Sequence, residues 1–144
     1  MPFRECLEYN YDFFLRLSGG FPESLNISDK SILIYITDHI VNMEIVRKMI
    51  DEKDAFDLLF IKPHPHIKDI KIDMEDVMII ESNLMFEFII HKLLKNKNRI
   101  TIWHEASTSV VYFLNDIETQ NWGKYAVFDE FVNNLSLMNI DLKC

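Results

Sequence analysis

The chain has 144 residues, about the length of one domain, and its 49% hydrophobic and 26% charged residues give an ordinary globular composition that argues against disorder. Its formal net charge of −8 disfavours non-specific binding to nucleic acid, which needs a basic surface against the phosphates. Its two cysteines, Cys6 and Cys144, form neither a disulfide framework nor a Cys-x-x-Cys motif, so a reducing compartment fits best.

Short apolar runs alternate with amphipathic segments along the chain. Residues 4–18 show apolar spacings of three and four, which predict an amphipathic helix that Gly19 and Gly20 end. A polar connector follows over residues 21–30. The pattern then predicts strands at 31–36, 56–61, 77–81, 99–103 and 125–128, helices at 41–52, 84–95 and 107–114, and a helix or a strand over 130–138.

This alternation is typical of βαβ units. The sequence therefore predicts an α/β fold, a Rossmann-like parallel sheet flanked by helices in a single domain. The connector is the one candidate boundary. We expect residues 1–30 to form an N-terminal helix and connector, and residues 31–144 to form the Rossmann-like unit.

No membrane-inserted or exported segment is expected. Charged residues within the first twelve positions interrupt any apolar core of a signal peptide. No apolar run approaches the roughly 18 residues that a membrane-spanning helix needs. We expect a soluble cytoplasmic protein, with peripheral contact at the inner face of the membrane as the remaining option.

The run Lys62-Pro63-His64-Pro65 directly follows the predicted strand 56–61. Pro63 and Pro65 restrict the backbone on both sides of His64. The carboxyl ends of strands are where open α/β sheets bind ligands. An imidazole held there could donate a hydrogen bond to a phosphate, or a proton to a leaving group near neutral pH. The alternative is a rigid loop that carries a surface histidine.

Two further segments follow later predicted strands. Ser107-Thr108-Ser109 opens a predicted helix, where free N–H groups and hydroxyls could bind an anion, and N-capping is the alternative. The carboxylate of Glu87 could accept hydrogen bonds from both hydroxyls of a sugar diol, and a solvated helix position is the alternative. His64, Glu87 and the serine segment are each about one βα unit apart, so they could meet at one rim of the sheet.

The order of these motifs resembles the bacterial sialyltransferase superfamily, including lipooligosaccharide sialyltransferases and capsule polysialyltransferases. Over roughly residues 30–130 the chain is similar to the C-terminal, CMP-binding half of these two-domain GT-B glycosyltransferases. The resemblance implies that His64 contacts the donor phosphate and assists departure of CMP as a catalytic residue. It implies that Glu87 holds the ribose and that the serine segment binds the phosphate. The expected donor-binding residues are Lys62, Pro65, Glu87, Ser107, Thr108 and Ser109.

Two features of that family are missing from the chain. The catalytic base of the family lies in an Asp/Glu-Asp/Glu-Gly motif of the N-terminal domain, and none of Gly19, Gly20 and Gly123 follows an acidic pair. A GT-B enzyme also needs two Rossmann-like halves, and 144 residues supply one. The chain alone is therefore expected to be an incomplete catalyst that needs a complementing N-terminal half.

Within these limits, the resemblance implies a CMP-sialic acid donor site for inverting, metal-independent glycosyl transfer to a surface glycan acceptor. The first alternative is a non-catalytic α/β binding or assembly module, a remnant of a longer glycosyltransferase gene, that self-associates through an exposed apolar face. The second alternative is an unrelated small Rossmann-like phosphate binder.

No cofactor and no metal site are predicted. His64 and His66 are two residues apart and could ligate a metal, but Pro65 lies between them and no cysteine or carboxylate cluster is near. His39 follows the first predicted strand and is expected at the same rim, beside the donor. His91 is expected to be a core or edge residue of its helix.

Overall fold

One sheet of five parallel strands organises the chain, in the order β3-β2-β1-β4-β5. The computed structural model describes residues 3–72, 74–123, 130 and 134. The strands are β1 (Ser31–Ile36), β2 (Leu58–Lys62), β3 (Val77–Ile79), β4 (Arg99–His104) and β5 (Glu118–Asn121). The helices are α1 (Phe3–Leu17), α2 (Met43–Asp51) and α3 (Phe86–Lys95), with short 3-10 helices η1 (Glu23–Leu25), η2 (Lys53–Ala55) and η3 (Thr108–Phe113). The predicted Rossmann-like α/β fold is confirmed.

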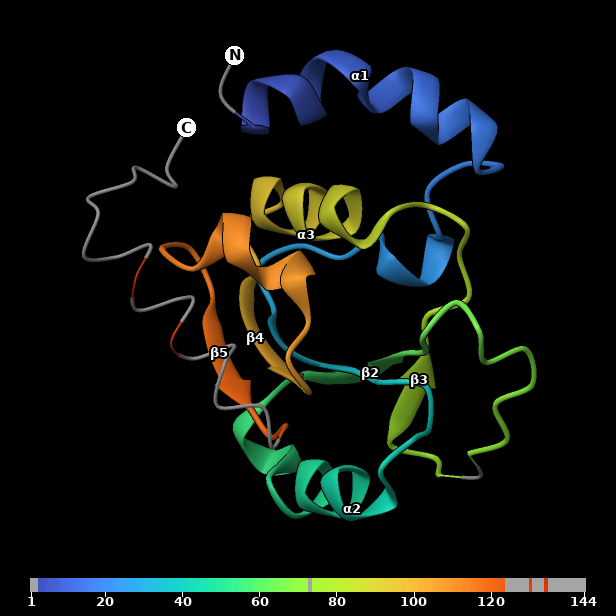
Figure 1. Cartoon of the computed structure of the whole chain (residues 1–144), viewed down its shortest axis with the longest axis vertical. Helices are drawn as coiled ribbons and strands as arrows, with labels where there is room; N and C mark the ends of the chain where they lie inside the picture. The colour runs from blue at the N-terminus through green and yellow to red at the C-terminus, as the bar shows by residue number, and fades with distance from the viewer. Residues whose placement is uncertain (1–2, 73, 124–129, 131–133, 135–144) are drawn as a thin grey trace.

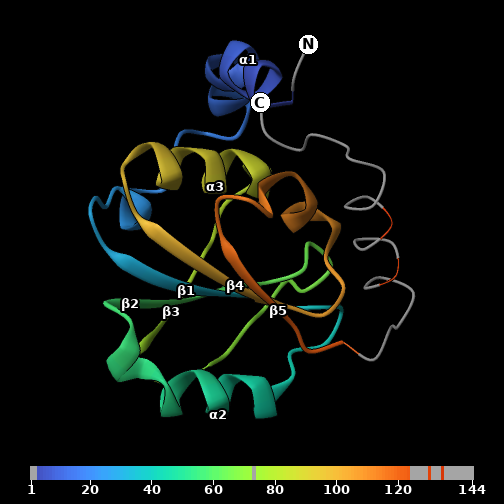
Figure 2. The ribbon, with the colours of Figure 1, turned by 90° about the vertical axis from the view of Figure 1, so that its left-hand side faces the viewer.

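The sheet separates two apolar cores because alternate residues of the central strand face opposite sides. Ile32 and Ile34 of β1 join the core beneath α3, and Leu33 and Tyr35 join the core beneath α2. All four side chains are fully shielded from solvent. Figures 1 and 2 show the resulting layers, with α3 and then α1 on one face of the sheet and α2 on the other.

Helix α1 covers α3 with its apolar face. Leu7 is buried, and the rings of Tyr11 and Phe14 lie against Phe88 with centroid separations of 6.0 and 5.1 Å. Leu7 and Leu25 belong to the same core cluster as the β1 and α3 residues, so the N-terminal segment shares the core of the sheet. None of the described helices combines the length and the apolar character that crossing a membrane requires.

The structure differs from the sequence prediction mainly after β4. The predicted helix over 107–114 is the six-residue 3-10 helix η3, and the edge strand β5 was not predicted. The predicted strand at 125–128 lies outside the described residues, as does the segment 130–138 except for residues 130 and 134.

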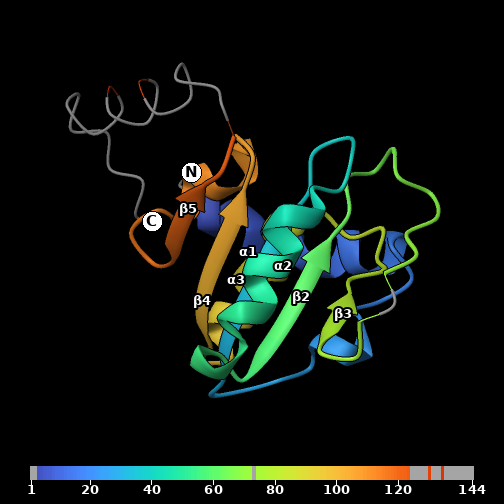
Figure 3. The same ribbon diagram turned by 90° about the horizontal axis from the view of Figure 1, so that it is seen from below.

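The parallel register brings three loops together at the carboxyl edge of the sheet. Ile36, the last residue of β1, pairs with Lys62 of β2 and with His104 of β4. The chain leaves β1 toward α2 on one face and leaves β4 toward η3 on the other, as Figure 2 shows, and Figure 3 looks onto the face that α2 covers. Open α/β sheets bind ligands at such a switch point, because the diverging connections leave a crevice between them.

Candidate functional site

A pocket of about 630 Å³ lies at this switch point, between the loops that follow β1, β2 and β4 and the start of α3. Its volume is within the range typical of small-molecule sites. The structure thus brings together all the residues that the sequence assigned to the donor site, and their individual roles stay predictions. Those residues are Lys62, His64, Pro65, Glu87, Ser107, Thr108 and Ser109.

Thr37 holds the turn that carries His64. Its Oγ1 accepts a hydrogen bond from the backbone amide of His64 at 2.9 Å, and its own amide donates to the carbonyl of Lys62 at 3.1 Å. Thr37 is only 4% exposed, so little water competes for these bonds. Thr37 was not among the site residues predicted from the sequence. A hydroxyl residue directly after a buried strand was the available signal.

The imidazole of His64 is oriented by its own loop. Its Nδ1 accepts a hydrogen bond from the backbone amide of His66 at 3.2 Å, so Nε2 carries the proton of the neutral ring and can donate to a ligand. Partial burial, together with the neighbouring rings of His39 and His66, lowers the pKa of His64. The neutral ring is therefore favoured at neutral pH.

Lys62 supplies positive charge to the pocket. It is half-buried, and its Nζ donates a hydrogen bond to the carbonyl of Pro63 at 3.2 Å. Burial lowers the pKa of the Lys62 ammonium group. Lys62 also lines a second pocket of about 580 Å³, which shares the turn from Lys62 to Pro65 with the first. The turn therefore forms a wall common to both pockets.

Two carboxylates line the pocket, and they differ in their partners. Glu87, in the first turn of α3, has no hydrogen-bond or ion-pair partner among the described residues. Glu105 is engaged, because its Oε2 accepts hydrogen bonds from the Tyr35 hydroxyl at 2.8 Å and from the Asp38 amide at 3.4 Å. Burial and the bond to Glu105 raise the pKa of Tyr35, which keeps the phenol protonated as a donor. Glu87 is therefore the carboxylate available to a ligand.

The serine segment is shaped by a hydrogen-bonded turn after β4. Ala106 has a φ of 60°, and its amide donates to Asn121 Oδ1 at 3.0 Å. The amide of Ser107 donates to Nδ1 of the buried His104 at 3.0 Å. The Ser107 hydroxyl caps η3 by accepting from the Ser109 amide at 3.4 Å.

Because η3 is a short 3-10 helix, an anion site here depends on hydroxyl groups. The helix dipole of one six-residue 3-10 segment is weak. Thr108 and Ser109 both line the pocket, and neither side-chain hydroxyl is used as the cap. They are the hydroxyls best able to donate to a bound anion.

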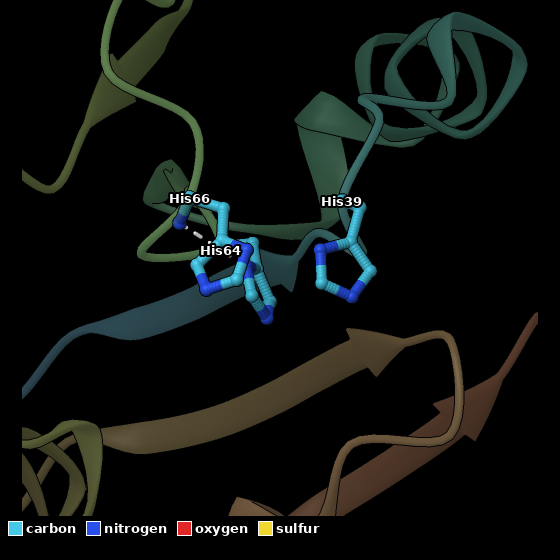
Figure 4. Close-up of side chains that lie close together, drawn as sticks. All are labelled: His39, His64 and His66. Atoms are coloured by element: carbon cyan, nitrogen blue, oxygen red, sulfur yellow. Dashed lines mark hydrogen bonds between the residues drawn. The ribbon is translucent and has the colours of Figure 1, made fainter.

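The loops after β1 and β2 also bring three histidines together. Figure 4 shows His39 beside His64 and His66, with ring centroids 4.1 Å apart for His39 and His64, 5.2 Å for His39 and His66, and 4.8 Å for His64 and His66. The sequence pattern indicated only His64 and His66 as a possible metal-binding pair. It placed His39 at the rim but could not show that its ring reaches theirs.

Comparison with known proteins adds no assignment. No family of known proteins matches the chain, and no curated protein and no solved structure does so either.

Proposed function

We propose that this chain binds a CMP-sugar, as the donor-binding half of a sialyltransferase-type enzyme. The observation that carries the proposal is the gathering, in one pocket, of three motifs that the sequence placed just beyond successive predicted strands. The pocket combines hydroxyl donors, an imidazole, an ammonium group and a carboxylate that has no partner within residues 3–72 and 74–123. A nucleoside monophosphate needs this combination, since its phosphate accepts hydrogen bonds and its ribose donates them.

The proposed roles follow from the chemistry of each group. The Nε2–H of His64 and the hydroxyls of Thr108 and Ser109 donate to the phosphate oxygens. The ammonium group of Lys62 adds a positive charge beside the anionic donor. The carboxylate of Glu87 accepts from the two ribose hydroxyls.

The second pocket offers room for the sugar of the donor. It adjoins the first along the turn that contains His64, and Lys62 lines both. A sugar that carries a carboxylate, such as sialic acid, would gain an attraction to the Lys62 ammonium group that a neutral sugar lacks.

Transfer would need a catalytic base of the kind that the resembled family carries in an acidic motif of its N-terminal domain. In an inverting transfer, the acceptor hydroxyl oxygen bonds to the anomeric carbon while the bond from that carbon to the phosphate oxygen breaks. The base takes the hydroxyl proton, and His64 donates a hydrogen bond to the departing CMP phosphate. This chain supplies the leaving-group side of that reaction.

Calorimetric titration of CMP into the chain tests the proposal, in a buffer with a chelator to exclude metal effects. We expect saturable binding that His64→Ala and Glu87→Gln each weaken by about tenfold or more, because each removes a hydrogen bond to or from a charged group. His91→Ala is the matched control, since His91 lies outside the pocket lining. No heat of binding at millimolar CMP would overturn the proposal.

Ligand analogues assign the contacts individually. Cytidine lacks the phosphate, so His64→Ala should weaken CMP binding and leave cytidine binding unchanged. Deoxycytidine monophosphate lacks the 2′-hydroxyl, so it should bind less tightly than CMP to the unaltered chain and about equally to Glu87→Gln. A discrimination against the deoxy analogue that persists in Glu87→Gln would contradict the ribose role of Glu87.

A second candidate function is assembly without catalysis, and the outer face of α1 favours it. Tyr9, Phe13 and Leu17 are 81%, 60% and 69% exposed and are spaced four residues apart, so they form one apolar stripe on α1. A second copy of this chain could cover the stripe. Sedimentation velocity would then show dimers that Phe13→Asp dissociates, whereas a monomer at high concentration would rule this candidate out.

A further inference from the structure

The loops after β1 and β2 carry a cluster of three histidines, His39, His64 and His66. The proposed function uses only His64 of the three. We propose that these three histidines form a binding site for a first-row transition-metal ion of the Zn²⁺ type. The observation behind it is the juxtaposition of three imidazoles from two loops, with one ring nitrogen of each lying within 4.8 Å of those of the other two.

Binding an ion requires the cluster to contract, and His64 must give up the bond that its Nδ1 accepts from the His66 amide so that a ring nitrogen is free to ligate the ion. Nitrogen ligands about 2.0–2.1 Å from a tetrahedral zinc ion lie about 3.4 Å apart. His39 and His66 are exposed, so their side chains can rotate toward a shared ion without disturbing the core. Figure 4 shows the three rings gathered on one side of the loops that carry them.

The backbone already restrains the positions of two of the three histidines, His64 and His39. Pro63 and Pro65 restrict the loop, and the bond from the His64 amide to Thr37 ties that loop to the end of β1. His39 lies two residues beyond Thr37 on the neighbouring loop. Both loops are therefore anchored at the same place, which limits the conformational entropy lost when an ion bridges them.

The chemistry of the ligand set selects the class of metal. Imidazole nitrogens suit zinc, copper and nickel, whereas calcium and magnesium require oxygen ligands. Three histidines also leave one position of a tetrahedral ion open, as in catalytic zinc sites. The Asp38 carboxylate, with Oδ1 3.8 Å from His39 Nε2, places a negative charge beside the cluster that attracts a cation.

Binding of ZnCl₂ to the tag-free chain, followed by calorimetry, tests the inference. We expect one ion per chain, and His39→Ala and His66→Ala should each weaken binding by at least about tenfold, since even indirect partners of metal ligands are worth 10- to 100-fold. His91→Ala and Cys6→Ser are the controls and should bind as the unaltered chain does. Circular dichroism confirms that the exposed-site variants remain folded.

Cobalt gives a second readout that does not depend on heat. Co²⁺ bound to three histidines in a tetrahedral site should show visible absorption, and His39→Ala and His66→Ala should abolish it. Zinc binding that is equal in the unaltered chain and in both variants, or the absence of binding, would overturn the inference.

The metal site and the nucleotide site can be tested separately. Only His64 belongs to both, because His39 and His66 lie outside the pocket lining. His39→Ala and His66→Ala should therefore lose zinc and keep their affinity for CMP in chelator, whereas Glu87→Gln should lose CMP and keep zinc.

Discussion

The hydroxyl of Thr37 accepts a hydrogen bond from the backbone amide of His64 at 2.9 Å, across 27 positions of the sequence. This bond joins the end of the central strand to the turn that carries the imidazole. Together with the bond from the Thr37 amide to the Lys62 carbonyl, it ties the two neighbouring loops to each other.

Thr37→Val should release the His64 turn. Valine has nearly the shape of threonine but cannot accept a hydrogen bond, so the partly buried amide loses its partner at a stability cost of about 1 kcal/mol. Amide hydrogen exchange measured by NMR should then show faster exchange at His64. CMP affinity should fall at the same time, because the imidazole is less well positioned.

Thr37→Ser is the matched control for that variant. It keeps the hydroxyl and loses one methyl group, which costs about 0.8 kcal/mol of burial. Its stability should resemble that of Thr37→Val, while exchange at His64 stays slow. Equal exchange rates in the two variants would show that the hydroxyl does not hold the turn.

Asn98→Ala should destabilise the fold. Asn98 is 5% exposed, its Nδ2 donates to the carbonyls of Ile27 and Leu93 at 2.9 Å each, and its Oδ1 accepts from the Lys30 amide at 3.0 Å. Alanine leaves the Ile27 carbonyl and the Lys30 amide without these partners, while the Leu93 carbonyl keeps the bond from the backbone amide of residue 98 at 3.2 Å. We expect a loss of about 2–4 kcal/mol in the free energy of unfolding in urea.

Asn115→Ala provides the comparison, because Asn115 is exposed. It should change the free energy of unfolding by no more than about 0.5 kcal/mol. A loss below 1 kcal/mol in Asn98→Ala would mean that water replaces the three bonds.

Phe88→Ala should weaken the packing of α1 on α3. Phe88 is 2% exposed and lies against the rings of Tyr11 and Phe14. Removing a buried aromatic ring costs about 3–5 kcal/mol, because apolar surface is lost and a cavity remains. Urea unfolding gives the magnitude, and limited proteolysis should cut the connector after α1 more rapidly.

Phe13→Ala tests whether the loss of stability expected for Phe88→Ala depends on the burial of the ring. Phe13 is 60% exposed on the same helix, so its removal should cost about 1 kcal/mol or less at concentrations where the chain is monomeric. Similar losses for both phenylalanines would contradict the packing of α1 described above.

Ala106→Gly should stabilise the chain. Ala106 has a φ of 60°, a left-handed conformation that costs residues with a Cβ about 1–2 kcal/mol. Glycine removes that strain but gains freedom in the unfolded chain, so we expect a net gain of up to about 1 kcal/mol. Thermal and urea unfolding both measure it.

Ala55→Gly should destabilise the chain. Ala55 is exposed in η2 and is not among the residues with positive φ, so only the entropic term applies and stability should fall by about 0.5–1 kcal/mol. The same sign for both substitutions would indicate that Ala106 is not strained.

The buried strands could be predicted because burial on both faces leaves a continuous apolar run. β1 and β2 each contain such a continuous apolar run, and their predicted bounds are close to the observed ones. β5 has the sequence Glu-Thr-Gln-Asn and is exposed along most of its length, so it carries no hydrophobic pattern. Backbone pairing with β4 creates that strand, and no local signal marks it.

The sequence could predict only those residues of the candidate site that follow a predicted strand. His64 and Ser107 follow predicted strands, which is why they could be assigned to one rim. The contacts of Thr37 and His39 depend on the pairing of Ile36 with Lys62, and that register is a property of the assembled sheet. Sequence spacing carries no information about it.

The position of β1 also sets the order in which the chain can finish folding during synthesis. The ribosome makes β1 early, and its partner β2 follows within one βα unit, but its other partner is Arg99–His104. Until that strand emerges, the most apolar strand of the sheet keeps one open edge, which is prone to pairing with other chains. Nascent chains that stall before Arg99 should therefore depend on chaperones in a way that the finished protein does not.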